Sequence, residues 1–262
     1  AVKALTRDTP GVGSTLFDDY QDRFRREAQL GAQLDHPHVI QVYDLEVEED
    51  TLYLVMECAP GGSLADLLKR KGSLPLEDFL RIATDAATGL GAIHEKLQIV
   101  HRDVKPSNIL LTDKRRAKIS DLGLAQVEGG LSRRSMLGSE AAGHPGTPLY
   151  MSPEQERESG YLQFPSDVYG LGCVMFEMLT GKPFKNQRPG TRLHDLRDDA
   201  PEWVDDLVAR CTRKDRDERP WDGNEVAELL SEGQAEPTIL RPQPVQAARA
   251  QQAPALPRTE SG

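Results

Sequence analysis

The chain has 262 residues, of which 38% are hydrophobic and 28% charged, and its formal net charge is −10. This composition is typical of a globular protein with a sizeable core. The acidic excess argues against an extended nucleic-acid-binding surface, which needs clustered basic residues. The three cysteines form no CxxC pair, which argues against zinc and disulfide frameworks and favours reduced thiols in the cytoplasm.

The N-terminal part of the chain predicts a small β-rich unit. Residues 1–5, AVKAL, indicate an apolar strand with Lys3 at its centre, and residues 6–15 are rich in turn-forming residues. Apolar side chains recur at helical spacing over residues 16–34, which predicts a helix. Residues 38–58 are rich in strand-forming side chains and are split by the acidic turn EEDT, which indicates an antiparallel hairpin.

The sequence after the glycine-containing joint at 60–63 predicts mainly helices. Residues 76–97 follow a first-turn proline, Pro75, and place five apolar side chains on one face: Phe79, Ile82, Ala86, Leu90 and Ile93. Two more helices are predicted over 167–181 and 201–214, and no apolar stretch is long enough to span a membrane. Residues 232–262 are rich in proline and predict a disordered tail or linker.

The stretch VHRDVKPSNILLTDKRRAKISDLGLA, residues 100–125, carries the groups that phosphoryl transfer needs. In chain order they are His101-Arg102-Asp103, Lys105, Asn108 and Asp121-Leu122-Gly123. Phosphoryl transfer depends on positioning and charge neutralisation, so a carboxylate must orient the attacking hydroxyl and a cation must balance the charge that develops. Magnesium needs oxygen ligands, which a second carboxylate and an amide carbonyl supply.

This order and spacing resembles the catalytic loop and metal motif of the protein kinase family, with DLG in place of DFG. The stretches HRDVKPSN and GTPLYMSPEQ are most similar to those of bacterial serine/threonine kinases. The resemblance implies an α+β, bilobal fold, with a partial β-rich N-lobe over 1–57, a helical C-lobe over 58–231 and the tail over 232–262. It also implies transfer of the ATP γ-phosphoryl group to serine and threonine hydroxyls of protein substrates.

The resemblance assigns this chemistry to four residues. Asp103 would be the catalytic base, and Lys105 would neutralise charge on the transferred phosphoryl group. Asn108 and Asp121 would bind Mg²⁺, with Mn²⁺ as the alternative ion.

The resemblance also implies an ATP site that explains a lysine inside an apolar strand. Lys3 would hold the α- and β-phosphates and pair with Glu27 on the following helix. Met56 would guard the back of the site. The other residues expected around the adenine are Glu57 and Ala59 through their backbone groups, Leu110 below the ring and Ala1 above it.

Four further residues would be structural. Glu154 would pair with Arg219, and breaking such a buried pair costs about 3–5 kcal/mol. Asp167 would brace the backbone of the catalytic loop, and Thr147 would brace the catalytic residues.

Residues 124–146 would form the activation segment, with Ser139 first among three candidate phosphosites that also include Ser135 and Ser132. A phosphate there could dock on Arg102 and order the segment. The alternative for each site is an unmodified, exposed serine. Autophosphorylation in trans would require self-association of the chain.

Two other interpretations remain open. The chain could be a catalytically silent binding module, because the glycine-rich loop and first two strands that precede this lysine in the family are not present before Lys3. The glycine-containing stretch PGVGST at 10–15 follows Lys3 and cannot serve as that loop. A small-molecule kinase is the third interpretation, which Lys105 and the GTPLYMSPEQ block argue against. Sequence beyond residue 262 could tether the protein to a membrane, although cytoplasmic placement is expected.

The first residues lead to one expectation about nucleotide affinity. Without the two strands that would cover the nucleotide, Lys3 would lie near a fraying terminus. We therefore expect the chain as given to bind Mg-ATP weakly. A tight, Mg²⁺-dependent affinity in calorimetry would contradict this expectation.

Overall fold

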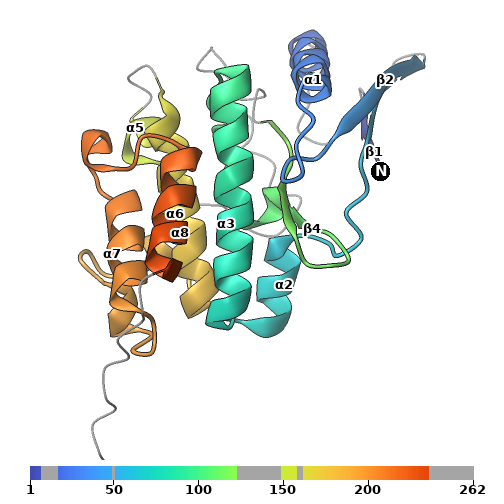
Figure 1. Cartoon of the computed structure of the whole chain (residues 1–262). Helices are drawn as coiled ribbons and strands as arrows, with labels where there is room; N and C mark the ends of the chain where they lie inside the picture. Colours follow the sequence, from blue (N-terminus) through green and yellow to red (C-terminus); the bar gives the residue numbers. More distant parts are fainter. Residues whose placement is uncertain (7–16, 49–50, 123–148, 158–161, 236–262) are drawn as a thin grey trace, which may run out of the picture.

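The computed structural model describes residues 1–6, 17–48, 51–122, 149–157 and 162–235. It shows a small lobe, in which a sheet packs against one helix, beside a larger lobe built mainly of helices (Figure 1). The predicted α+β, bilobal architecture is therefore confirmed.

The small lobe consists of β1 (Val2–Leu5), α1 (Phe17–Ala32), β2 (Val42–Glu48) and β3 (Thr51–Met56). The three strands form an antiparallel sheet in the order β1-β3-β2, so the predicted hairpin over 38–58 is present.

One face of this sheet is buried against α1. Leu52 and Leu54 of β3 are buried and pack with Phe24 and Ala28 of α1. Lys3 is the cross-strand partner of Leu54. Because partners in a sheet point to the same face, this register directs Lys3 toward α1 rather than toward solvent.

The large lobe contains the other helices and strands of the described residues. Its longer helices are α2 (Leu64–Lys71), α3 (Leu76–Ala92), α6 (Phe164–Thr180), α7 (Glu202–Cys211) and α8 (Gly223–Ala235). Its shorter elements are the π-helical turn Ile93–Leu97, β4 (Ile109–Leu111), β5 (Ala117–Ile119), α5 (Pro153–Glu156) and the 3₁₀ turns Pro106–Asn108, Phe184–Asn186, Leu193–Asp195 and Arg216–Glu218.

Helix α3 lies at the centre of the large lobe and packs against α8 and α6 (Figure 1). All five apolar residues predicted on its inner face, Phe79 through Ile93, are fully buried. Pro75 stands just before the first helical residue, as the N-cap, rather than within the first turn. The crossing with α8 needs glycine, because a Cβ on Gly223 would lie 2.3 Å from the backbone nitrogen of Gly91.

The C-terminal boundary differs from the prediction. Residues 232–235 belong to α8 and not to a tail. This helix is anchored by Leu230, which is fully buried, and by Gly233, whose missing side chain leaves room for the Trp203 ring. The rest of the predicted tail lies outside the described residues. Within the described part of the chain, no helix combines the length and hydropathy that a membrane crossing requires.

Candidate active site

A short antiparallel ribbon brings the two expected metal ligands together. Ile109 of β4 pairs with Ile119 of β5. Asn108 therefore precedes one strand at the same end of the ribbon at which Asp121 follows the other. The backbone N–H of Ser120 donates to the carbonyl of Asn108 at 2.9 Å, and the Ser120 hydroxyl donates to Asp121 Oδ2 at 3.0 Å.

Asp103 lies beside a cation and an amide. Lys105 Nζ is 2.7 Å from Asp103 Oδ2, and Asn108 Nδ2 donates to the same oxygen at 2.9 Å. Asn108 Nδ2 also donates to the backbone carbonyl of Asp103 at 2.9 Å. The Asp103 side chain remains 28% exposed, so an incoming hydroxyl can reach it.

Asp167, near the start of α6, holds the backbone before Asp103. Its Oδ2 accepts the N–H of His101 at 2.6 Å and its Oδ1 accepts that of Arg102 at 2.7 Å. The buried ring of His94 lies 2.9 Å from Oδ2. Two non-glycine residues of the site, Arg102 (φ 70°) and Asp121 (φ 57°), have left-handed backbones, which persist only where the surroundings hold them.

Lys3 lies between two carboxylates. Its Nζ is 2.5 Å from Asp121 Oδ1 and 3.4 Å from Glu27 Oε1. Burial opposes the charged amine, but Glu27 and Asp121 outweigh it and raise the pKa of Lys3 above its usual value. Burial likewise opposes charge on Asp121, yet Lys3 lowers the pKa of that carboxyl. Both groups are therefore charged at neutral pH.

The donor set fits a magnesium nucleotide. In the described residues, no group of three or more histidine, cysteine, aspartate or glutamate side chains could hold a metal ion alone. Magnesium is usually bound by one or two carboxylates together with substrate phosphates and water. Asp121 and Asn108 can supply such oxygens, and Lys3 supplies a cation for phosphate.

Residues 57–59, the hinge between the lobes, follow β3 directly and include Glu57 and Ala59, which are expected beside the adenine. The Ala1 ammonium donates to the carbonyl of Met56 at 2.6 Å, and the Met56 N–H donates to the carbonyl of Ala1 at 2.9 Å, which aligns the first residue with the end of β3. Leu110 forms an isolated antiparallel bridge with Ser63, which follows Glu57 and Ala59 in the chain.

An ion pair at the hinge was not predicted. Lys118 Nζ lies 2.7 Å from Glu57 Oε2, and both side chains are largely buried. The two residues are 61 positions apart, and no local pattern signals their meeting. His94, the partner of Asp167, was missed for the same reason.

Glu154 and Arg219 form the expected pair. The two guanidinium nitrogens lie 2.7 Å and 2.9 Å from the two carboxylate oxygens, in a bidentate arrangement. The Arg219 side chain is fully buried. Burial would raise the pKa of Glu154, but the hydrogen bonds from Arg219 and Ser166 lower it to about 2.

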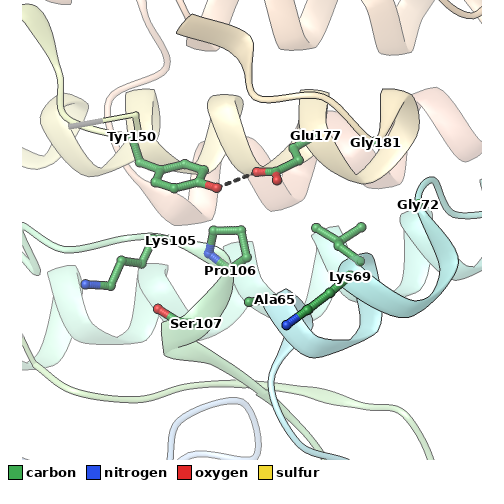
Figure 2. A pocket seen from close by; sticks show the side chains of 10 residues that line it. Ala65, Lys69, Gly72, Lys105, Pro106, Ser107, Tyr150, Glu177 and Gly181 are labelled. Atoms are coloured by element: carbon green, nitrogen blue, oxygen red, sulfur yellow. Dashed lines mark hydrogen bonds between the residues drawn. The ribbon is translucent and has the colours of Figure 1, made fainter. Parts of the chain in front are cut away.

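A pocket of about 300 Å³ opens beside the catalytic loop (Figure 2). It lies between α2 and α6 and is lined partly by Lys69, Lys105 and Ser107. At its edge the Tyr150 hydroxyl donates to Glu177 Oε2 at 2.5 Å. Burial raises the pKa of Glu177.

Four expected site residues fall outside the described part of the chain. They are Thr147 and the candidate phosphosites Ser132, Ser135 and Ser139. Their roles stay predictions.

Comparisons with known proteins show which family the chain belongs to. The chain is 35% identical over 213 residues to the serine/threonine-protein kinase PrkC of Bacillus subtilis, covering 76% of this chain and 31% of that protein. It is 39% identical over 187 residues to the serine/threonine-protein kinase PknB of Mycobacterium leprae, covering 70% of this chain and 28% of that protein. The chain thus spans about a third of the length of these curated relatives.

The fold is also that of a solved kinase domain. The crystal structure of a single-site mutant of the Mycobacterium tuberculosis PknI kinase domain superposes with a TM-score of 0.67, covering 89% of this chain and 84% of that one at 24% identity. Residues 2–231 match the family described as protein kinase domain. The chain therefore belongs to the protein kinase family.

Proposed function

We propose that this chain transfers the γ-phosphoryl group of ATP to serine and threonine hydroxyls of proteins. One observation carries the proposal: Asp103, contacted by Lys105 and Asn108, lies in one site with the Lys3–Asp121 pair. The names of the relatives PrkC and PknB support the choice of serine and threonine as acceptors. The assembled polar groups support an enzyme over a silent binding module.

Each residue has a defined part in the proposed reaction. Asp103 orients the acceptor hydroxyl and takes its proton, and Lys105 balances the negative charge that develops on the transferred group. Asp121 and Asn108 would hold Mg²⁺, which when bound neutralises phosphate charge. Lys3 would bind the phosphates, kept in place by Glu27.

The pocket in Figure 2 supports a protein substrate. It adjoins Lys105 and Ser107 of the catalytic loop and is open enough for a side chain next to the acceptor residue. Autophosphorylation through self-association, at Ser139 foremost, belongs to the same proposal. So does cytoplasmic placement, where ATP is available and the free thiols of Cys58, Cys173 and Cys211 stay reduced.

Label transfer from γ-labelled ATP to a generic protein substrate tests the proposal. We expect transfer with Mg²⁺, none with EDTA, and a strong loss in Asp121→Asn. The assay includes an N-terminally extended form of the chain. Absence of Mg²⁺-dependent transfer from both forms would refute the proposed function.

Replacing Lys3 with methionine is expected to raise the KM for ATP and to lower kcat/KM by about 10²–10³-fold, because a preorganised charge is lost at the phosphates. Steady-state kinetics measure the effect. Lys114→Met, an exposed lysine in the turn between β4 and β5, is the matched control and should change kcat/KM by less than about twofold. Equal kinetic constants for the two variants would show that Lys3 does not bind the ATP phosphates.

A further inference from the structure

Gln155 is a buried amide that the proposed mechanism does not use. It lies on the single turn of α5 and is only 4% exposed. Its Oε1 accepts the backbone N–H of Ser152 at 2.9 Å, and its Nε2 donates to the backbone carbonyl of Arg102 at 2.8 Å. Because an N–H only donates and a carbonyl only accepts, one orientation of the amide satisfies both partners.

The carbonyl that Gln155 contacts belongs to the peptide group joining Arg102 to Asp103. The N–H of the same group, on Asp103, donates to His101 Nδ1 at 3.3 Å. This peptide plane is therefore bound at both edges. Its orientation sets the direction in which the Asp103 side chain leaves the backbone.

The backbone at this point needs support. Arg102 has φ 70°, a left-handed conformation that costs about 1–2 kcal/mol for a residue with a Cβ. Asp167 binds the N–H of Arg102 on one side of the strained residue, and Gln155 binds its carbonyl on the other.

We propose that Gln155 is a positioning residue for Asp103, which couples the docking of residues 149–157 to the orientation of the catalytic carboxylate. This inference rests on the proposed kinase function. A glutamate at position 155 could still accept from Ser152, but it would turn an acceptor toward the Arg102 carbonyl. A methionine would leave both backbone groups without the bond.

The test compares Gln155→Met and Gln155→Glu with Glu156→Gln in the full chain. Glu156 is an exposed neighbour on the same turn, and the amide can keep its contact with Lys185. We expect Gln155→Met to lower kcat about 10–100-fold, because small displacements of a catalytic group have effects of this size. The KM for ATP should stay within about twofold, and Glu156→Gln should match the parent.

The Gln155→Glu variant adds a pH-dependent readout. A protonated carboxyl has an O–H donor and a carbonyl acceptor, so it can restore both bonds that the amide makes. Burial raises the pKa of a carboxyl at this position. The kcat of Gln155→Glu relative to the parent should therefore rise as the pH is lowered from about 8 to about 6, whereas the ratio for Gln155→Met should stay constant.

The outcomes separate this inference from the proposed function. A parent chain without phosphoryl transfer would refute the function itself. An active parent with a kcat of Gln155→Met within about twofold of its own would overturn the positioning role. A flat pH ratio for Gln155→Glu, or loss of folding in both Gln155 variants by thermal denaturation, would assign Gln155 a structural role only and also overturn it.

Discussion

Replacing Asp103 with asparagine is expected to lower kcat for phosphoryl transfer about 10²–10⁴-fold, the range that a general base contributes. The amide keeps the volume of the carboxyl and can still accept from Lys105 or Asn108, so the fold should persist. The KM for ATP should change little, because the proposed partner of Asp103 is the acceptor hydroxyl and not ATP. Steady-state kinetics with varied ATP measure both quantities.

The control for this prediction is Asp113→Asn, the same chemical change at an exposed aspartate after β4. It should leave kcat within about twofold of the parent. Thermal denaturation checks that both variants are folded. A folded Asp103→Asn variant with a kcat within about threefold of the parent value would show that Asp103 is not the catalytic base.

Replacing Arg219 with methionine is expected to lower the free energy of unfolding by about 3–5 kcal/mol, because it leaves the largely buried Glu154 carboxylate without its charged partner. The guanidinium also donates to the carbonyls of Arg213, Lys214 and Pro165, which would lose those bonds. Urea denaturation of the parent and the variant measures the difference.

Arg213→Met is the matched control for Arg219→Met. Arg213 is 59% exposed at its side chain and lies 3.9 Å from Glu218, so its loss should change stability by less than about 1 kcal/mol. Equal destabilisation by the two variants would show that the Glu154–Arg219 pair contributes no more than a surface pair.

The same pair predicts a dependence of stability on pH. The pKa of Glu154 is lowered to about 2 in the folded chain, whereas an unfolded glutamate titrates near its ordinary value of 4.5. A group with a lowered folded pKa stabilises fully above its unfolded pKa, and this contribution is lost as the pH falls toward the folded value. The stability gap between the parent and Arg219→Met should therefore narrow from about pH 5 to about pH 2. A constant gap over this range would contradict the assignment.

The grouping of the expected catalytic and metal-binding residues could be predicted because their signals are local. Asp103, Lys105, Asn108 and Asp121 lie within 19 positions, and a short ribbon between the last two makes their meeting a consequence of strand pairing. The direction of Lys3 came from the family resemblance and not from the strand pattern, because Lys3 lies on the face that packs against α1 while the apolar Val2 and Ala4 lie on the other. Its partner Glu27 came from the family resemblance.

Other contacts carried no such signal. Gln155 meets Arg102 across 53 positions, and Lys118 meets Glu57 across 61, so only the assembled lobes bring them together. Helix α8 was not predicted as a helix, and residues 232–235 were assigned to the tail, because its sequence, GNEVAELLSEGQA, has glycine near both ends and few apolar residues. Packing against α3 and Trp203 overrides this weak propensity.

The identity of the phosphorylated residue tests the central claim most directly. ATP labelled at the γ-phosphate is incubated with Mg²⁺, a protein substrate and either the parent or Asp103→Asn, and the labelled amino acids are identified after hydrolysis. We expect phosphoserine and phosphothreonine with the parent and almost no label with the variant. Label on other residues, or equal labelling by parent and variant, would contradict the assignment of this site as a serine/threonine kinase centre.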